Sequence, residues 1–466
     1  MIFVIGSSSS AIAASYALIN RGLEVTMLDV GIEPKIDSIK PVKKDDLIKL
    51  ARGSDYPYAE VRKNFKIIES KNVSCLPSFA QGGLTNVWGA FCENYSQENL
   101  KDWPINLADL QIHNQAIAEI LKPSNSYKSS SQAQYLLSKW QKNSVQLSKN
   151  GFSFSRPNLA VDFSRCIYCG QCQSGCPDDL IFSSRHHISK LKTYKNFKYL
   201  GDCVVGSIKE NSAKVEIKAN RLSDKSALNF EATQVFIGCG PIISTKLIVD
   251  ALGLQNEKIV LKDSSHFLIP CVMTKRINGA STEKLHSLTQ ISAKLQNPKI
   301  STRPINLQFY SFMDQYLDAL GLLKNFKFLS ERLIAIQGHL DSSDSNQFSF
   351  ELVGDQIQLT ELTNPKTKKI IKKTADFLAK NFFDLGIFPL LPMVSISKIG
   401  RSFHYGGSFP MSSKNQKFAS DIYGRPNGLQ RIHLIDASVF PSIGAGSITP
   451  TIMANAYRIA SQCLVK

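Results

Sequence analysis

The sequence predicts an α/β fold in which a discontinuous domain on parallel strands is interrupted by an inserted α+β domain on an antiparallel sheet. Three observations predict this. The first 28 residues read as strand, helix and strand. A second apolar strand opens a helix in mid-chain, and a turn, a strand and a helix return after about residue 400. Between them, residues 266–361 alternate with a period of two, as half-buried antiparallel strands do.

The N-terminal segment sets the pattern of the first domain. Residues 2–5 form an apolar strand, a serine-rich turn follows, and an amphipathic helix runs to about Arg21 before Gly22 stops it. Residues 24–28 form the second strand. A βαβ unit of this kind places two parallel strands side by side under one crossover helix, as in a Rossmann-like nucleotide-binding domain.

The turn after the first strand matches the dinucleotide-binding pattern imperfectly. Gly6 makes the tight turn, and Ala11 stands where a third glycine lets helix and strand pack closely. Ser8 replaces the glycine at which the backbone approaches a pyrophosphate, although its hydroxyl can donate to a phosphate oxygen at the helix N-terminus. Asp29 ends the second strand and is placed to bind ribose hydroxyls. The alternative is a βαβ unit that binds no nucleotide.

The later elements divide the rest of the chain. They are expected in this order: a polar loop at 35–60, a Gly-rich segment at 81–90, a helix at 107–121, a polar excursion at 123–149, antiparallel strands at 204–231, a strand opening a helix at 235–240, a hairpin at 347–359 bending at Gly354 and Asp355, and a helix at 366–385. We therefore assign 1–122, 191–260 and 396–466 to the discontinuous domain, 123–190 to the excursion with a cysteine-rich loop, and 261–395 to the inserted domain.

The cysteine-rich loop carries the most specific motif of the chain. Its string CIYCGQCQSGCP has the C-x2-C-x2-C-x3-C-P spacing that ligates iron–sulfur clusters, with Cys166, Cys169, Cys172 and Cys176 as the ligands. No second run of this kind exists in the sequence, so a single [4Fe–4S] cluster is the simplest interpretation and a three-ligand [3Fe–4S] cluster is the variant. A zinc knuckle and a disulfide pair are the alternatives.

The charge composition indicates which kinds of partner the protein favours. The net charge of +17, from 55 Lys and Arg against 38 Asp and Glu, favours anionic partners. Lysines gather at 40–49 and 366–373. The second run has apolar residues at helical spacing, so we prefer a solvated helix face, with docking to an anionic partner or a peripheral membrane contact as the alternative. No nucleic-acid motif accompanies the charge, and we expect no nucleic-acid partner.

Targeting signals are not visible in the sequence. No apolar run approaches the length that spans a bilayer, and the N-terminus has neither a basic leader nor a cleavage site. Six further cysteines are scattered along the chain, which suits a reducing compartment. We expect a cytoplasmic protein, with export bound to a leader-bearing partner as the alternative.

Several segments together resemble the glucose–methanol–choline (GMC) flavin oxidoreductases. HLIDASVFPSIGAGSITPTIMANAYRIA (433–460) looks like the closing FAD-binding signature of that family, and GGLTNVWGA (82–90) looks like the segment laid along the isoalloxazine. WPINLADL (103–110), VFIGCGPIISTKLI (235–248) and RSFHYGGSFPM (401–411) resemble its continuation, the central crossover near FAD and the active-site histidine segment. The blocks cover about half the chain in the family's order.

The resemblance implies a discontinuous Rossmann-like FAD-binding domain with an inserted substrate domain. It assigns FAD to these candidates: Gly6, Ser8, Ala11 and Asp29 at the ADP end, Val205 in the central strands, Gly83, Asn86 and Trp88 beside the flavin, and Asp436, Ala437 and Thr449 in the C-terminal segment.

The resemblance also implies the catalytic residues, with one departure. His404 corresponds to the base that takes the proton of an alcohol as hydride moves to the flavin. The family's second His or Asn, just before a proline, is replaced here by Thr449 before Pro450. Threonine can donate a hydrogen bond to the substrate oxygen but cannot act as a base, and Thr-Pro also suits an N-cap followed by the first helical residue. A structural role is the alternative for His404, and His339 is a distant second candidate.

The cluster and the flavin together imply a dehydrogenase. We expect FAD and a [4Fe–4S] cluster, oxidation of a CH–OH group of a sugar, polyol or sugar-derived substrate, and electron relay to an acceptor protein or a quinone. The alternatives are an oxidase with a structural cluster, a reductase fed through the cluster, a non-redox lyase that keeps flavin for structure, and a pure electron carrier.

Overall fold

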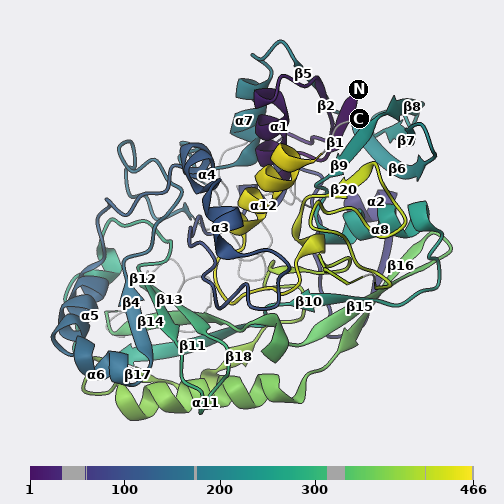
Figure 1. The fold of residues 1–466 in the computed structure, drawn as a ribbon. Helices are drawn as coiled ribbons and strands as arrows, with labels where there is room; N and C mark the ends of the chain where they lie inside the picture. Colours follow the sequence, from purple (N-terminus) through teal and green to yellow (C-terminus); the bar gives the residue numbers. More distant parts are fainter. Residues whose placement is uncertain (34–57, 59, 173–175, 312–330, 415, 464–466) are drawn as a thin grey trace.

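The computed structural model describes residues 1–33, 58, 60–172, 176–311, 331–414 and 416–463. Figure 1 shows a parallel sheet with its helices in the upper part and a large antiparallel sheet below it. Four sheets in all hold the named strands of the described residues. The mixed α/β architecture predicted from the sequence is confirmed. The predicted loop at 35–60 lies almost entirely outside the described residues.

The parallel sheet gathers strands from distant parts of the chain. Its order is β20-β9-β1-β2-β5, and every neighbouring pair is parallel. The central strands are buried at every position, as expected for a parallel sheet covered on both faces. The strands span Ile2–Ile5 (β1), Val25–Leu28 (β2), Phe197–Leu200 (β5), Gln234–Ile237 (β9) and Ile432–Leu434 (β20).

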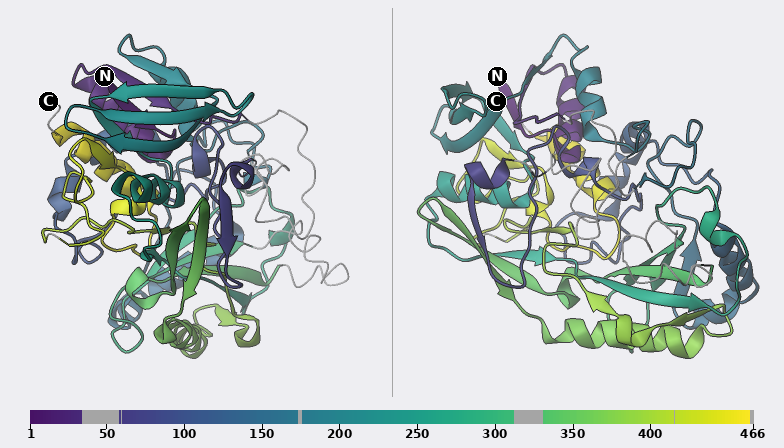
Figure 2. Two further views of the ribbon diagram at one scale, coloured as in Figure 1. Left: turned by 90° about the vertical axis from the view of Figure 1, so that its right-hand side faces the viewer. Right: turned by 180° about the vertical axis from the view of Figure 1, so that it is seen from behind.

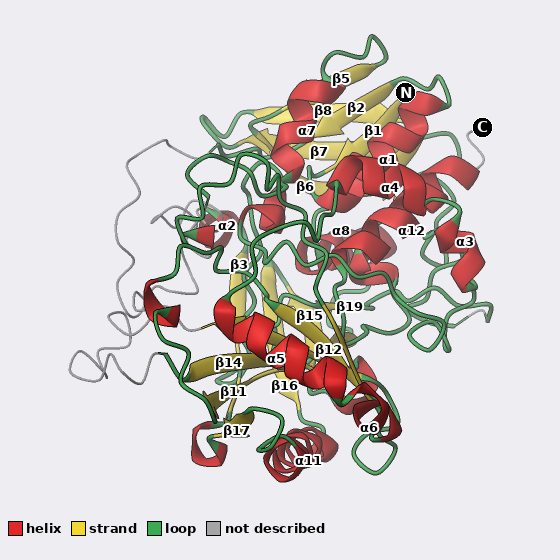
Figure 3. Ribbon diagram, turned by 90° about the vertical axis from the view of Figure 1, so that its left-hand side faces the viewer, coloured by secondary structure: helices red, strands yellow, loops and turns green. Residues whose placement is uncertain are grey.

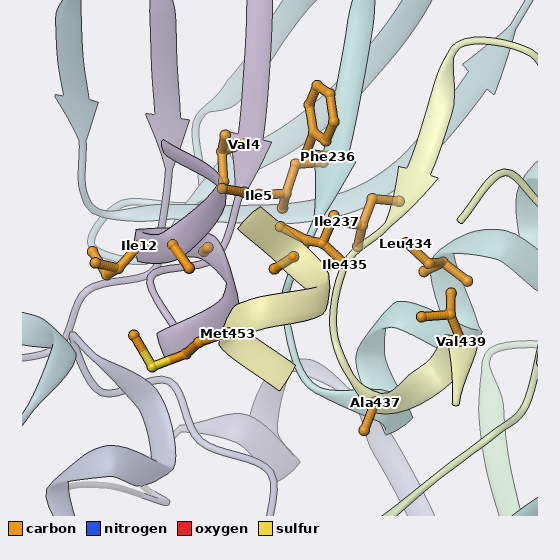
Figure 4. Close-up of a cluster of buried hydrophobic side chains, with 14 of the residues drawn as sticks. Val4, Ile5, Ile12, Phe236, Ile237, Leu434, Ile435, Ala437, Val439 and Met453 are labelled. Carbon is orange, nitrogen blue, oxygen red and sulfur yellow. The ribbon is translucent and has the colours of Figure 1, made fainter. Parts of the chain in front are cut away.

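Helices from the two ends of the chain cover this sheet side by side. Helix α1 (Ser9–Asn20) packs against α12 (Thr449–Gln462), and α1 also contacts α7 (Ser184–Leu191). Figure 4 shows Ile12 of α1 and Met453 of α12 close to the apolar side chains of β1, β9 and β20. The predicted stop of the first helix is confirmed, since Arg21 is its C-cap and Gly22 follows with φ 76°.

A small antiparallel sheet flanks the parallel one. The predicted alternation at 204–231 forms β6 (Cys203–Glu210), β7 (Val215–Arg221) and β8 (Ala227–Ala232), seen at the top of the left view in Figure 2. Helix α8 (Pro241–Leu252) starts directly after β9, as expected from the mid-chain apolar strand.

The inserted sheet has seven strands, in the order β17-β11-β14-β13-β12-β4 with β18 also paired to β11. Figure 3 shows helix α11 (Pro365–Asn381) end-on beside this sheet. The strands span Phe152–Ser155 (β4), His266–Met273 (β11), Ile291–Leu295 (β12), Ile305–Ser311 (β13), Leu333–His339 (β14), Ile387–Pro389 (β17) and Ser395–Ile396 (β18).

The segment at 123–149, expected as a polar excursion, is mostly helical. It forms α5 (Ser131–Lys142) and α6 (Ser144–Lys149) beside the inserted sheet. Ala133, Leu136 and Trp140 recur at helical spacing and are fully buried. The Trp140 indole donates to the Leu385 carbonyl at 3.0 Å. Three apolar residues among many Ser and Gln were therefore enough to dock the helix.

A second five-stranded sheet joins the upper and lower parts, in the order β19-β10-β15-β16-β3. The predicted hairpin is confirmed as β15 (Gln347–Val353) and β16 (Gln356–Leu362), with Gly354 at φ 59°. It pairs with β10 (Ile259–Asp263) and β3 (Lys66–Glu69) rather than with the seven-stranded sheet. Strand β19 (Tyr405–Gly406) completes the sheet and directly follows His404.

Two helices differ in extent from the ones that the sequence predicted. The helix expected at 107–121 is divided into α3 (Leu107–Gln111) and α4 (Asn114–Leu121), and α3 has a capping box between Asn106 and Asp109. Helix α11 ends at Asn381, before the predicted 385. A short helix α2 (Val61–Asn64) precedes β3. Among the described residues, no helix has both the length and the apolar character needed to cross a membrane.

Candidate active site

A cavity of about 690 Å³ runs between the parallel sheet and the inserted sheet, a volume typical of a ligand site. Most of the predicted cofactor and catalytic residues line it, although they come from the start, the middle and the end of the chain. These are Gly6, Ser8, Asp29, Gly83, Trp88, Val205, His404, Asp436, Ala437 and Thr449.

The turn after β1 forms a tight wall at one end of the cavity. Gly6 has φ 95°, and a Cβ there would lie 2.6 Å from the Gly238 carbonyl oxygen. A Cβ on Gly238 would in turn lie 3.3 Å from that of Ala11. Ser8 is the N-cap of α1 and accepts from the Ala11 amide at 3.4 Å. Small residues here bring helix and strands close together and leave a helix N-terminus facing the cavity.

Asp29 is a buried carboxylate at the end of β2. It accepts a hydrogen bond from the Tyr199 hydroxyl at 3.0 Å. Burial raises the pKa of Asp29 to about 6, while hydrogen bonds from Ser7 and Tyr199 act to lower it. A buried acceptor of this kind suits the hydroxyls of a ribose, which would supply further donors.

The Gly-rich segment lies against the turn after β1. The Gly82 amide donates to the Ser7 hydroxyl at 2.8 Å, and Gly83 has φ 58° beside Ser8. Asn86 does not line the cavity, contrary to the prediction of a flavin-facing position. Its amide instead donates to the carbonyls of Gln81, at 2.9 Å, and Gly83, at 2.7 Å, and so holds the turn from behind.

Trp88 connects the cavity wall to the segment that follows the cysteine loop. Its indole donates to the Phe182 carbonyl at 2.8 Å, and the two rings meet edge to face with centroids 5.9 Å apart. The Ser183 hydroxyl donates to Asn86 Oδ1 at 2.9 Å. Two consecutive residues after the loop are thus bonded to the wall of the cavity.

None of the four cysteines of the motif lines the cavity. Cys169 is exposed and the other three are half-buried. The Tyr168 amide donates to Cys166 Sγ and the Leu180 amide to Cys176 Sγ, each at 3.4 Å. Cys176 and Cys169 raise the pKa of Cys166, after the larger effect of burial, so the thiols lie within electrostatic reach of each other.

The C-terminal segment supplies the opposite wall. Asp436 is buried and accepts from the Ser244 hydroxyl at 2.5 Å, and the Ala437 carbonyl accepts from the Gly407 amide at 2.8 Å. Thr449 begins α12, whose N-cap is Ile448, one residue earlier than the Thr-Pro pattern predicted. Thr449 is therefore the first helical residue rather than the N-cap, and it lines the cavity.

His404 is held at the cavity by its backbone. Its amide donates to the Ser402 hydroxyl at 2.9 Å, and its carbonyl accepts from the Ser264 amide at 2.9 Å. The preceding Phe403 has φ 58°, a left-handed conformation that is strained in a bulky residue. His404 Nδ1 is buried without a hydrogen-bond partner, and burial lowers the pKa of the ring to about 4. The ring is therefore neutral at physiological pH.

Comparisons with known proteins agree with this geometry. Residues 368–456, which include His404 and Thr449, match the family model described as GMC oxidoreductase. Residues 159–182 match a 4Fe-4S binding domain. The C-terminal segment of the chain is therefore similar to that of the GMC oxidoreductases. No curated protein matches the chain.

A solved structure shows the same fold over almost the whole chain. It is the crystal structure of pyridoxine 4-oxidase from Mesorbium loti, with a TM-score of 0.64 and 13% sequence identity. The match covers 99% of this chain and 98% of the other. The two matched segments indicate FAD and a [4Fe–4S] cluster as the cofactors.

The residues of the chain fit both cofactors. The FAD cradle is consistent with the Gly6 turn, which admits no side chain, and with the buried acceptor Asp29. In the part of the chain that the structure describes, which omits 173–175, no three ligand-type side chains are placed around a single ion. A cluster spreads its cysteine ligands over separate irons and needs a wider arrangement than zinc, which holds its ligand sulfurs at about 2.3 Å. Amide donors to Cys166 and Cys176 suit thiolates.

Two histidines and three uncharged polar residues in this site were largely missed by sequence reasoning. His266 and His339, named only as a remote candidate or not at all, lie directly opposite each other in the β11–β14 ladder and line the cavity. Gln308, Tyr310 and Gln337 line the same face. The period-two pattern assigns such residues to one face only once the strand register is known.

Proposed function

We propose that this protein is an FAD-dependent dehydrogenase that oxidises a CH–OH group of a sugar, polyol or sugar-derived substrate and passes the electrons through its [4Fe–4S] cluster to an external acceptor. One observation carries the proposal. The segment that closes the cysteine loop is hydrogen-bonded to Trp88, on the wall of the same cavity that His404 lines, and to Asn86 behind that wall. A cluster held by those cysteines would therefore lie beside the flavin site.

The proton chemistry belongs to this chain's own residues. FAD, when bound, supplies a two-electron hydride acceptor that can release electrons singly. His404, neutral because of burial, takes the hydroxyl proton of the substrate. Thr449 lines the same cavity and donates a hydrogen bond to the substrate oxygen without acting as a base.

The substrate class rests on the polar wall of the inserted sheet. The Tyr310 hydroxyl donates to Gln308 Oε1 at 2.9 Å and accepts from the Thr289 hydroxyl at 2.8 Å. Gln337 lies on the neighbouring strand and lines the cavity as well. Uncharged donors and acceptors at this density suit a polyhydroxylated substrate better than an apolar alcohol.

The test is anaerobic mixing of the purified holoenzyme with a panel of aldoses, ketoses, polyols and aromatic alcohols. Flavin absorbance and the paramagnetic-resonance signal of the cluster are followed together. A sugar or polyol is expected to bleach the flavin, and the cluster signal should then appear. A bleached flavin with a permanently oxidised cluster would contradict the relay.

An oxidase with a structural cluster is the second candidate, because the solved neighbour is titled an oxidase. The two functions differ in their acceptor. Rapid peroxide formation in air, without an added acceptor and at the rate of flavin reduction, would favour the oxidase.

A further inference from the structure

Two cationic side chains line the cavity on the same segment as His404. This segment, residues 397–404, connects β18 to β19. Lys398, Arg401 and His404 all line the cavity. The segment bends where the Arg401 amide donates to the Lys398 carbonyl at 3.1 Å. The expected base and the two positive charges are therefore held together by one short stretch of chain.

The Arg401 guanidinium lacks an acceptor. The side chain is half-buried, and its Nη1 atom is fully buried without a hydrogen-bond partner. In the described part of the chain, no hydrogen bond or ion pair of this side chain is present. A guanidinium is always charged and has five N–H donors, so a buried nitrogen without an acceptor costs free energy. A bound anion with acceptor oxygens would recover that cost.

Two carboxylates lie close enough to this turn to be considered as partners. Burial is the largest cause that raises the pKa of the Cys75 thiol, and the charges of Glu69 and Asp263 raise it further. The charge of Arg401 acts on the same thiol and lowers its pKa. All three charged groups are therefore within electrostatic reach of one buried atom.

Both of these carboxylates are already engaged elsewhere. Glu69 accepts from the Arg62 guanidinium at 2.9 Å and from the Cys75 amide at 2.7 Å. Asp263 accepts from the Ser402 hydroxyl at 2.5 Å and from a backbone amide of the same turn. The fold thus satisfies its own acids here without using the guanidinium that faces the cavity.

The charges that line the cavity are segregated. Among the described lining residues, the acids are Asp29 and Asp436, which follow strands of the parallel sheet, and each accepts a hydrogen bond from a hydroxyl of the chain. The N-terminus of α1 on that side offers free N–H groups to a pyrophosphate. Lys398 and Arg401 are on the other side with His404 and the uncharged residues of the inserted sheet. A cleft wall of one sign attracts a ligand of the opposite sign.

We propose that Arg401, assisted by Lys398, binds an anionic group of the substrate, and that the substrate is a sugar acid or a sugar phosphate. The inference deepens the proposed function and rests on it for the oxidation of a CH–OH group. The planar fork of arginine donors matches the paired oxygens of a carboxylate or a phosphate. The anion would fix one end of the substrate, while Gln308 and Tyr310 hold hydroxyls and His404 meets the reacting one.

The first experiment compares substrates that differ only in the anion. Anaerobic flavin reduction of the holoenzyme is followed with glucose, glucuronate and glucose 6-phosphate, and with galactose and galacturonate, at constant ionic strength. The ratio of the reduction rate to the dissociation constant should be at least about tenfold higher for a charged member than for its neutral partner. The uronates and the phosphate ester separate a carboxylate site from a phosphate site. Equal ratios for charged and neutral members would overturn the inference.

The variants test whether Arg401 is the source of that preference. Arg401→Met removes the charge, Arg401→Lys keeps the charge without the fork, and Arg221→Met is the matched control. Arg221 is exposed at the end of β7 and outside the cavity, so the control removes the same unit of charge from the whole chain. In Arg401→Met the preference for the charged member should fall at least about tenfold, through weaker binding, and in Arg401→Lys it should fall less. The control should keep the wild-type preference.

A titration without substrate separates this inference from the proposed function. Calorimetry follows the binding of inorganic phosphate and of acetate to the oxidised holoenzyme. At least one of the two should bind saturably to the wild type and to Arg221→Met, and at least about tenfold more weakly to Arg401→Met. If no sugar bleaches the wild-type flavin, the proposed function fails and this titration alone decides the inference.

Three outcomes of the titration would overturn the inference. The first is no saturable binding to the wild type, and the second is equal binding to the wild type and Arg401→Met. The third is an Arg401→Met protein that folds but has lost its FAD, because the guanidinium would then serve the cofactor. Where Arg401→Met does not fold, Arg401→Lys replaces it and should bind the anion at least about threefold more weakly than the wild type, and equal binding would again refute the assignment.

Discussion

At the scale of single residues, the cavity has two kinds of special position. At the first kind no side chain fits, and at the second a side-chain nitrogen is buried without a hydrogen-bond partner. Gly6 is the clearest example of the first kind, because both its backbone angle and the carbonyl of Gly238 exclude a Cβ. His404 is an example of the second, because its Nδ1 is buried without a partner. The two positions lie in the same cavity and can be tested separately.

Gly6→Ala is expected to lower the free energy of unfolding by about 2–4 kcal/mol, because the strain of an alanine at positive φ adds to the collision of its Cβ with the Gly238 carbonyl. The variant is also expected to lose its FAD. The matched control is Gly22→Ala, where φ is 76° but nothing lies within 4 Å of the added Cβ. The control should lose only about 1 kcal/mol and keep its FAD. Urea unfolding and flavin counts check both, and equal losses in the two variants would contradict the role given to the Gly6 turn.

His404→Ala is expected to slow flavin reduction by a factor on the order of 10²–10⁴, as loss of a general base does. The pH dependence follows from the pKa of about 4. The neutral ring is the active form and a lowered pKa keeps it neutral, so the rate should be constant from pH 8 to about pH 5 and fall only as the pH approaches 4. A stopped-flow pH series checks this, and a rate that halves near pH 6.5 would show an unperturbed histidine.

At the scale of elements, helix α5 and the segment after the cysteine loop do more than their sequences suggested. Helix α5 was expected as part of a polar excursion, yet Trp140 packs against Phe152 and Phe309 of the inserted sheet. The loop segment, expected only to carry ligands, also holds Trp88 and Asn86. Each element therefore joins two parts of the fold.

Trp140→Ala is expected to lower the free energy of unfolding by about 3–5 kcal/mol, as removal of a fully buried aromatic does. Lys142→Ala, two residues further on the exposed face of α5, should change it by less than about 0.5 kcal/mol. Guanidinium titrations followed by circular dichroism measure both. A small effect at Trp140 would mean that α5 is not part of the core of the inserted sheet.

Trp88→Phe removes the indole donor to the Phe182 carbonyl and keeps an aromatic ring at the wall. In the proposed relay, cluster reduction should slow several-fold while flavin reduction by substrate stays near the wild-type rate. Separate recording of the flavin absorbance and the cluster's paramagnetic signal tests this. Equal slowing of both would place Trp88 in substrate oxidation rather than between the cofactors.

Local patterns were sufficient for much of the fold and for part of the site. The βαβ opening, the hairpin at Gly354 and the cysteine motif depend on neighbours within about ten residues, so sequence reasoning could reach them. His266 and His339 are 73 positions apart in the chain and meet only through strand register. Asn86 was misplaced because the motif fixes its segment and not the direction of its amide.

At the scale of the whole molecule, positive charges outnumber negative ones. The chain carries a net charge of +17, and Lys368, Lys369, Lys372 and Lys373 lie exposed along α11. The expected helix at this lysine run is confirmed, with Ile370 and Ile371 on its buried side. Whether this exposed face is only solvated, as we prefer, or docks an anionic partner stays a prediction, and the summed field favours anions at a distance.

Turnover with ferricyanide, an anionic acceptor, should therefore depend on ionic strength. Raising the salt from 20 to 300 mM is expected to lower kcat/KM for ferricyanide about tenfold or less, through screening of the net charge. A neutral quinone acceptor serves as the control and should show little dependence. If salt lowers kcat/KM equally for both acceptors, the salt would be acting on the stability of the protein and not on the electrostatic attraction of ferricyanide.

The bond between Phe182 and Trp88 has a consequence for how the enzyme matures. Because one short stretch both finishes the iron site and fixes the flavin wall, filling either site should stiffen the other, and the gain in affinity must be equal in both directions. Protein purified from iron-starved cells would then lack the yellow colour of the flavin as well as the brown colour of the cluster.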